Sequence, residues 1–337
     1  MNPRLPGLIE DAVEKFQLSL TGTRILTEAA TGHFAVTPVI AARAGAEVFA
    51  FTRASRFGSV ADVERETAEL SAAVSPDLPI HVVTSLDSVP LDTIDVATNT
   101  GFLRPFDARL IDRLPRSCVI PLMWETWEWR PDELDLDACR RAGIKVYGTD
   151  EDDERLRTKE YLGFVVLQRL LAAKRTPLSS RVLVLGSTDF TAPVHRLLCR
   201  TGYTCTLATV DDRLDAAAFD VLVLLEHRRR IKLVGDAGAL IPTATLRAHH
   251  AVIHICGEAD FSGLACYHDP ALPARFGAMS YTADHVDPKA VVDLHAAGLN
   301  VAAGMLKANA GGLAGGAYRQ FMETACPGQA FADERYW

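Results

Sequence analysis

Short β-rich segments alternate with helix-forming segments along most of this sequence. In the first half, strands are expected at RILTEAA and AEVFAFT, separated by GHFAVTPVIAARAG, in which apolar residues recur at helical spacing. The alternation continues with strands at IHVVT, IDVATNT, CVIPLM and IKVYGT and with helices at VADVERETAELSAAV, DARLIDRLP and LDACRRAG. Strands that alternate with helices in this way predict an α/β fold, with a parallel sheet covered by helices on both faces.

The sequence contains a second alternation after one long helical segment, ERLRTKEYLGFVVLQRLLAAKR. The later strands are expected at RVLVLG, YTCTLATV, DVLVLLE, AVIHICG and finally AVVDLHAAG. A chain of 337 residues also exceeds the usual size of a single core. We therefore expect two Rossmann-like parallel-sheet domains joined by a crossing helix. Residues 1–156 would form a substrate-type domain, residues 157–316 a nucleotide-binding-type domain, and a helix within 317–337 would pack back on the first domain.

Composition and charge narrow the classes of partner. Hydrophobic residues make up 48% and charged residues 23% of the chain, which is ordinary for a globular protein. Because 35 basic residues face 43 acidic ones, the net charge is −8, which disfavours nucleic acid. No apolar run is long enough for a membrane helix, and the acidic start MNPRLPGLIEDAVEKF does not resemble a signal peptide. We expect a cytoplasmic protein whose partner is a small molecule.

The seven cysteines are scattered and odd in number, and none forms a CxxC pair. These features disfavour both a disulfide framework and a structural zinc site. We expect no metal, and we expect most of the cysteines to be buried apolar residues.

The order of local motifs carries a resemblance to a known superfamily. The segment DLDACRRAGIKVYGT, from Asp135 to Thr149, has the pattern D-L-x-A-x-R-x-x-G-I-x-V followed by Thr, and the long helix and a Rossmann-like turn at Gly186 come next. Over about two thirds of its length the chain resembles the D-2-hydroxyacid dehydrogenases of the formate and glycerate dehydrogenase kind. The resemblance implies a homodimeric NAD- or NADP-dependent oxidoreductase that acts on a small 2-oxo acid, 2-hydroxy acid or imine between its domains.

The turn GSTDFT is an altered form of the dinucleotide-binding turn. Gly186 keeps the place of the first glycine, whereas Thr188 and Thr191 stand at the second and third places. Asp189 adds a carboxylate that competes with phosphate for the helix N-terminus. The acidic residue expected to bind the ribose is absent, and Thr209 stands at its place.

Two interpretations of this turn are open. In the first, the turn only bends the chain and Asp189 caps the following helix. In the second, the turn from Gly186 through Ser187, Thr188, Asp189 and Phe190, together with Thr209, binds NAD or NADP. Arg213 or the basic run 228–230 would then supply positive charge.

The resemblance also implies a catalytic set. In the superfamily an arginine holds the substrate carboxylate, a histidine exchanges the hydroxyl proton, and an acidic residue supports that histidine. Gly257 or Glu258 stands at the place of the arginine, so Arg104 is a candidate replacement. Asp269 and His295 match the acid and the histidine. The alternative for His295 is a half-buried histidine at a strand end that bonds a backbone carbonyl.

The first domain contains a second candidate region. Thr31, Gly32 and His33 follow the first strand, where backbone amides can receive a phosphate or a carboxylate. Asn99, Thr100 and Gly101 follow a neighbouring strand, and ligands of α/β sheets bind at the carboxyl ends of strands. We expect these residues to converge on a substrate. The alternative is an ordinary helix start beside a basic surface loop.

The loop MWETWEWRP concentrates three tryptophans and two glutamates. Trp124 and Trp127 are expected to line a pocket for an aromatic or cationic ligand, with Glu125 or Glu128 as base or counter-ion. The alternative is a domain or subunit contact, because tryptophan is enriched in interfaces.

Three hypotheses of function follow from these patterns. The first is the divergent NAD(P)-dependent oxidoreductase. The second is a redox-silent lyase, cyclase or hydrolase without a dinucleotide, which would use Glu125, Glu128 or His33. The third is a ligand-binding protein without catalytic activity.

Overall fold

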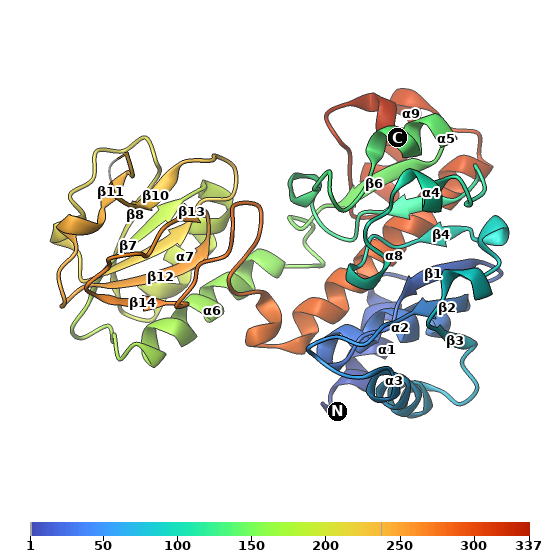
Figure 1. Cartoon of the computed structure of the whole chain (residues 1–337), viewed down its shortest axis with the longest axis horizontal. Coiled ribbons are helices and arrows are strands. Elements are labelled where there is room, and N and C mark those ends of the chain that lie inside the picture. Colours follow the sequence, from blue (N-terminus) through green and yellow to red (C-terminus); the bar gives the residue numbers. More distant parts are fainter. Residues whose placement is uncertain (1, 237) are drawn as a thin grey trace. The chain divides into compact units, whose positions relative to one another are not determined.

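The computed structural model describes residues 2–236 and 238–337 and divides them into two compact units. The first unit contains the residues up to Leu156 together with Pro288–Trp337, and the second contains Arg157–Asp287. Figure 1 labels most of the helices and strands of both units. The α/β class expected from the sequence is confirmed, with a parallel sheet in each unit. Segment 288–316, which sequence analysis assigned to the second domain, is grouped with the first unit by its contacts.

The first unit is built on a seven-stranded sheet, as far as the described residues show. The strand order is β15-β6-β5-β4-β1-β2-β3, and every neighbouring pair is parallel except β15 with β6. The strands are β1 (Arg24–Glu28), β2 (Glu47–Phe51), β3 (Ile80–Val83), β4 (Val96–Ala97), β5 (Val119–Pro121), β6 (Lys145–Thr149) and β15 (Gly328–Gln329). All but β15 were expected from the sequence. Because the order reverses between β1 and β4, the carboxyl ends of these two strands define the switch point of this sheet.

Some helices of the first unit begin or end at recognisable caps. Ser59 and Asp62 form a capping box at the start of α3, and Gly143, with φ of 74°, closes α5. The helices are α1 (Leu5–Lys15), α2 (Val36–Arg43), α3 (Val60–Val74), α4 (Ala108–Ile111), α5 (Leu136–Ala142), α8 (Pro288–Ala310) and α9 (Gly315–Ala325). Shorter 3-10 turns include η1 (Gly32–Ala35), η4 (Gly101–Leu103) and η5 (Thr126–Glu128).

Helix α8 corrects one sequence-based prediction. The segment AVVDLHAAG was expected to be the last strand, but it lies inside this 23-residue helix. Pro288 occupies its first position, where a proline fits well, and the residues after Val292 are rich in alanine and leucine. The helix contacts α1, α2, β5 and β6, so most of its residues are buried and its apolar run shows little helical periodicity.

The second unit contains a five-stranded parallel sheet in the order β14-β12-β9-β7-β8. Its strands are β7 (Arg181–Gly186), β8 (Thr204–Ala208), β9 (Val221–Leu225), β12 (Ala251–Cys256) and β14 (Tyr267–Asp269). A small parallel sheet of β10 (Lys232–Gly235), β11 (Ile241–Pro242) and β13 (Glu258–Ala259) and the helices α6 (Thr158–Ala172) and α7 (Thr188–Arg200) complete the unit. The strand order reverses between β7 and β9, which defines a second switch point.

The central strands of the second unit are nearly continuous apolar runs. All five residues of β9 and all six residues of β12 are buried, as expected for a sheet covered on both faces. Within residues 2–236 and 238–337, no helix combines the length and apolar character needed to cross a bilayer.

Candidate functional site

The switch point of the first sheet brings together the residues that follow β1 and β4. β1 pairs with β4, and the hydroxyl of Thr98 donates a hydrogen bond of 2.7 Å to that of Thr27. One carboxylate oxygen of Glu28, at the end of β1, accepts a 2.8 Å hydrogen bond from the amide of Phe102, just beyond Gly101. The ends of these two strands therefore meet, as the topological rule predicts.

The amides at this switch point are occupied by carboxylates of the chain itself. Glu66 of α3 accepts a 2.8 Å hydrogen bond from the amide of Gly32, and Glu28 accepts from the amide of Phe102. Thr31 donates its hydroxyl proton to the carbonyl of Phe57, at 3.3 Å. An external phosphate or carboxylate at these positions would have to displace Glu28 or Glu66.

Glu28 should make the stability of the protein depend on pH. Burial raises the pKa of its carboxyl group, although the Phe102 amide and the Arg104 charge act in the opposite direction. Between the ordinary pKa of 4.5 and the raised value, the folded state holds a proton that the unfolded state releases, so stability falls as pH rises. Glu28→Gln keeps an acceptor for Phe102 but does not titrate. At pH 8 we expect its free energy of unfolding to exceed that of the wild type by about 1 kcal/mol, so it should unfold at a higher temperature.

The check is a series of thermal unfolding curves between pH 4 and pH 8. The two proteins should converge near pH 4 and separate as pH rises. Parallel curves over the whole range would contradict this account of Glu28.

His295 lies in the first unit, buried inside α8 with only 1% of its surface exposed. Its Nδ1 atom lies 2.5 Å from the hydroxyl oxygen of Thr37 in α2. The rings of Phe34 and Trp124 lie 6.0 Å and 6.2 Å from its imidazole. The alternative interpretation, a histidine at a strand end bonded to a carbonyl, is therefore wrong in its position, because the residue lies in a helix and Nδ1 contacts a hydroxyl.

Asp269, the expected partner of His295, belongs to the second unit. Its carboxylate accepts a hydrogen bond from the hydroxyl of Tyr281 and lies 3.8 Å from the guanidinium of Arg169. Because the two residues are in separate units, their pairing stays a prediction.

Arg104 already contacts three other side chains of the first unit. It donates to the side-chain and backbone oxygens of Asn99, both at 3.1 Å, and forms a 2.8 Å ion pair with Glu133. Its guanidinium also lies over the ring of Trp124 at 5.1 Å. Arg104 would have to exchange one of these partners to hold a substrate carboxylate. Thr100 lies beside Asn99, with its hydroxyl 3.2 Å from that of Thr98.

The tryptophan loop forms its own polar network. Trp127 donates its indole proton to Glu125 at 2.7 Å, and Gln329 donates to the other oxygen of that carboxylate at 3.4 Å. Burial, followed by the charges of Glu151 and Glu125, raises the pKa of Glu128 well above its ordinary value. The raised pKa favours the protonated form of Glu128, whereas Glu125 accepts hydrogen bonds within the loop.

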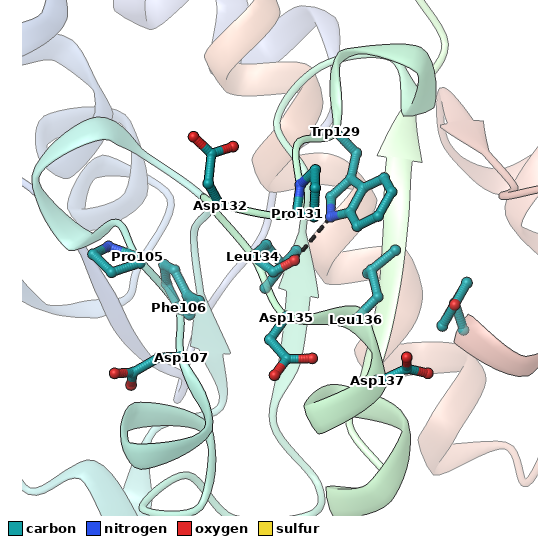
Figure 2. A pocket seen from close by; sticks show the side chains of 11 residues that line it. Pro105, Phe106, Asp107, Trp129, Pro131, Asp132, Leu134, Asp135, Leu136 and Asp137 are labelled. Carbon is teal, nitrogen blue, oxygen red and sulfur yellow. Dashed lines mark hydrogen bonds between the residues drawn. The ribbon is translucent and has the colours of Figure 1, made fainter.

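A cavity of about 300 Å³ opens beside this loop, as Figure 2 shows. Trp129, Phe106 and Tyr336 contribute aromatic surface to it. Its lining also includes four carboxylates and no basic side chain among the described residues: Asp107, Asp132, Asp135 and Asp137. Asp107 and Asp135 also cap α4 and α5. Arg141 and Arg140 partly neutralise Asp135 and Asp137, so the remaining negative charge of the lining favours a cation over an anion.

The turn after β7 in the second unit requires glycine at its first position. Gly186 has a φ of 145°, and a Cβ atom there would lie 2.2 Å from the backbone oxygen of Leu225 in β9. At the third position, Thr191 is buried and donates its hydroxyl proton to the carbonyl of Ser187 at 3.1 Å. The turn therefore keeps the close strand contact of a dinucleotide-binding turn, and a threonine replaces its last glycine.

Asp189 does not cap α7. Its carboxylate instead lies 3.2 Å from Nε2 of His227, 3.1 Å from the guanidinium of Arg228 and 3.8 Å from the ammonium of Lys159. Burial alone would raise the pKa of Asp189, but His227 and Arg228 outweigh it and hold the pKa well below its ordinary value. Phe190 stacks on His227, with ring centroids 4.0 Å apart.

Ser187, the residue before α7, also leaves the helix uncapped. Its hydroxyl donates a 2.6 Å hydrogen bond to Oε1 of the buried Glu226. That carboxylate oxygen also accepts hydrogen bonds of 2.8 Å from the amides of Arg228 and Arg229. The described residues therefore provide no side-chain cap for α7. The interpretation in which Asp189 caps this helix is wrong.

An acidic residue, Asp212, lies in the loop that follows β8. Asp212 accepts hydrogen bonds from the amide and the hydroxyl of Thr209, at 2.7 Å and 2.9 Å. Its neighbour Asp211 forms a 2.5 Å ion pair with Arg229. The sequence pattern pointed to Thr209, and the Asp212 carboxylate is hydrogen-bonded directly to that residue.

Several residues of both switch points were not predicted from the sequence, namely Glu28, Thr37, Glu66, Lys159, Asp212, Glu226 and His227. For Glu226 and His227 a signal was present, because they directly follow the buried strand VLVLL (β9), which pairs with β7 at the glycine turn. Glu66 and Thr37 act through contacts between elements and carry no local motif.

Comparison with known proteins bears on the fold. No protein-family model and no curated protein matches the sequence. Dipicolinate synthase from Bacillus subtilis is similar in the structure of its A chain, with a TM-score of 0.57 and 14% identity over 87% of this chain and 99% of that one. The same polypeptide of dipicolinate synthase from Bacillus halodurans gives a TM-score of 0.53 and 13% identity over 82% and 96% of the two chains.

A D-lactate dehydrogenase from Treponema pallidum is less similar, with a TM-score of 0.48 and 10% identity over 88% of this chain and 99% of that chain. At these identities a shared structure establishes a shared fold and leaves activity open. This chain is therefore a divergent protein with the D-2-hydroxyacid dehydrogenase-like fold, as its sequence predicts.

Proposed function

We propose that this protein is an NAD-dependent oxidoreductase that acts on a small 2-oxo acid, 2-hydroxy acid or imine. The observation that carries the proposal is the start of α7 at the second switch point. The amides of its first turn have no side-chain cap within the described residues, because Asp189 contacts His227, Arg228 and Lys159 instead.

The residues at this turn fit a pyrophosphate. Gly186 allows the backbone to turn at the end of β7, and the 13-residue helix α7 points its positive end toward the same place. Lys159 and Arg228 offset the charge of Asp189, so that this carboxylate does not repel a phosphate as an isolated one would. The corresponding amides of the first unit are occupied by Glu28 and Glu66, which favours the second unit for the dinucleotide.

The end of β8 supports NAD over NADP. The Asp212 carboxylate can accept hydrogen bonds from the two ribose hydroxyls of NAD, whereas it would repel the 2′-phosphate of NADP. Asp211 adds a second negative charge, which Arg229 neutralises.

His295 is the proposed acid/base. A bound nicotinamide would supply or accept hydride. The substrate oxygen or nitrogen then needs a proton, which the Nε2 atom of His295 would hold, because Nδ1 contacts Thr37. Thr37 would fix the orientation of the imidazole. Its hydroxyl is a neutral partner for the imidazole.

The test begins with binding. We expect NADH to quench tryptophan fluorescence and bind at micromolar concentration, and NADPH to bind at least about tenfold more weakly. Asp212→Ala should weaken the binding of NADH about tenfold and reduce the difference in affinity between NADH and NADPH. Asp236→Ala serves as a control for lost surface charge. Absence of NADH and NADPH binding at millimolar concentration would refute the proposal. If NADH binds, 2-oxo acids and imines are screened for its oxidation.

The acidic cavity of Figure 2 favours a second candidate, a redox-silent protein that binds an organic cation in its first unit. Its aromatic rings and carboxylates suit an ammonium or guanidinium group. Titration with guanidinium and tetramethylammonium ions distinguishes the candidates. Binding of either ion that is lost in Trp129→Ala, without any binding of NADH, would support the second candidate.

A further inference from the structure

Two cysteines and a histidine meet where α7 is followed by β8. Cys199 lies in the last turn of α7 and is exposed, and Cys205 lies in β8 and is partly exposed. The other five cysteines of the chain are all buried. These two thiols are therefore the ones that a reagent in solution can reach.

The same imidazole nitrogen contacts both cysteines. Nε2 of His195, one helical turn before Cys199, lies 3.5 Å from the Cys199 sulfur and 3.4 Å from the backbone oxygen of Cys205. The Cys199 thiol also lies close enough to the Cys205 thiol to raise its pKa. Because α7 packs against β8, side-chain rotation can bring the two sulfur atoms together.

We propose that Cys199 and Cys205 are a redox-sensitive pair that a peroxide converts into a disulfide, with His195 as the proton acceptor for Cys199. This inference is independent of the proposed oxidoreductase activity. It identifies a covalent modification site on the outside of the second unit.

The reaction balances in two steps. His195 takes the thiol proton of Cys199, and the thiolate attacks one oxygen of hydrogen peroxide. The O–O bond breaks, hydroxide leaves and is protonated to water, and Cys199 becomes a sulfenic acid. Cys205 then loses its proton and attacks the Cys199 sulfur, so the S–O bond breaks and a second water leaves. The two sulfurs together lose two electrons, which the peroxide gains.

The surroundings favour this order of events. Burial, followed by the neighbouring Cys199, raises the pKa of Cys205 to about 12, so Cys205 is not the first thiol to ionise. Burial raises the pKa of Cys139 and Cys326 to about 12 as well, but neither is exposed to solvent.

Trypsin separates the two cysteines, so a disulfide between them can be detected directly. Trypsin cleaves after Arg196, Arg200 and Arg213, so Cys199 and Cys205 fall on separate peptides, 197–200 and 201–213. The full-length protein is treated with hydrogen peroxide, the remaining thiols are alkylated, and the digest is analysed without reduction by mass spectrometry. We expect the two peptides to appear joined, lighter by two hydrogen atoms than their sum, and to separate on reduction.

Matched variants identify the groups involved. Cys199→Ser and Cys205→Ser should each abolish the joined peptide, whereas Cys266→Ser should leave it unchanged. His195→Gln should slow its formation about tenfold at pH 7, and raising the pH should remove most of that difference. The proposal is overturned if Cys199 is oxidised to sulfinic acid without joining Cys205, or if the buried cysteines react as fast as this pair. Circular dichroism of every variant checks that the fold is intact.

Discussion

Replacing Gly186 by alanine is expected to abolish NADH binding and to destabilise the second unit by about 3 kcal/mol. The added Cβ would lie 2.2 Å from the backbone oxygen of Leu225 and 2.7 Å from the amide nitrogen of Glu226. Both are backbone atoms at the end of β9, which pairs with β7, so relief of the clash would separate two central strands. The φ of 145° adds strain for any residue with a side chain.

Gly202→Ala is the matched control. Gly202 also has a positive φ, 91°, but a Cβ there would meet only the side chain of Pro177, at 3.6 Å. We expect it to cost about 1 kcal/mol and to leave NADH affinity unchanged. Urea unfolding measures the first effect and fluorescence titration the second. If Gly186→Ala bound NADH like the wild type, the turn after β7 would not be the dinucleotide site.

The sequence predicted the sheets better than the segments around them. Strands such as VLVLL at β9 are continuous apolar runs, and this pattern depends only on burial of both faces of the sheet. The small sheet of β10, β11 and β13 was not expected, because two of its strands have only two residues each. Helix α8 was mistaken for a strand in part, because a helix that is buried on most sides lacks the polar face that marks an amphipathic helix.

The site was predictable only where one element determines it. The position of Gly186 follows from its place between a strand and a helix. The direction of Asp189 does not, because it depends on Lys159 and on the loop after β9, which fold against it from distant parts of the sequence. The hydrogen bond from the amide of Gly32 to Glu66 likewise joins segments that are distant in the sequence. The sequence identified backbone amides that can bind an anion. The tertiary structure determines which of these amides already donate to a carboxylate of the chain.

The second large effect is expected at His295. If its Nε2 atom moves the substrate proton, His295→Gln should lower kcat by about 1,000-fold and leave the affinity for NADH within a factor of two. Glutamine keeps a polar group of similar length in this buried position beside Thr37. A loss of NADH affinity as large as the loss of kcat would instead indicate a structural role.

Thr37 should act through His295 and show a smaller effect of the same kind. Thr37→Val keeps the shape of the side chain and removes the hydroxyl that lies 2.5 Å from Nδ1. Without this partner the imidazole can rotate or change tautomer, so we expect kcat to fall about 30-fold with little change in KM. Thr37→Ser should restore most of the activity, because the hydroxyl returns.

Thr52→Val provides the control for Thr37→Val. Thr52 is also fully buried in the first unit, but its hydroxyl has no hydrogen-bond partner within the described residues. Its replacement should leave kcat unchanged and alter stability by less than about 1 kcal/mol. Equal losses of activity in the two valine variants would mean that Thr37 contributes only to packing. A loss confined to Thr37→Val, and reversed by serine, would establish a neutral hydroxyl as the group that orients His295.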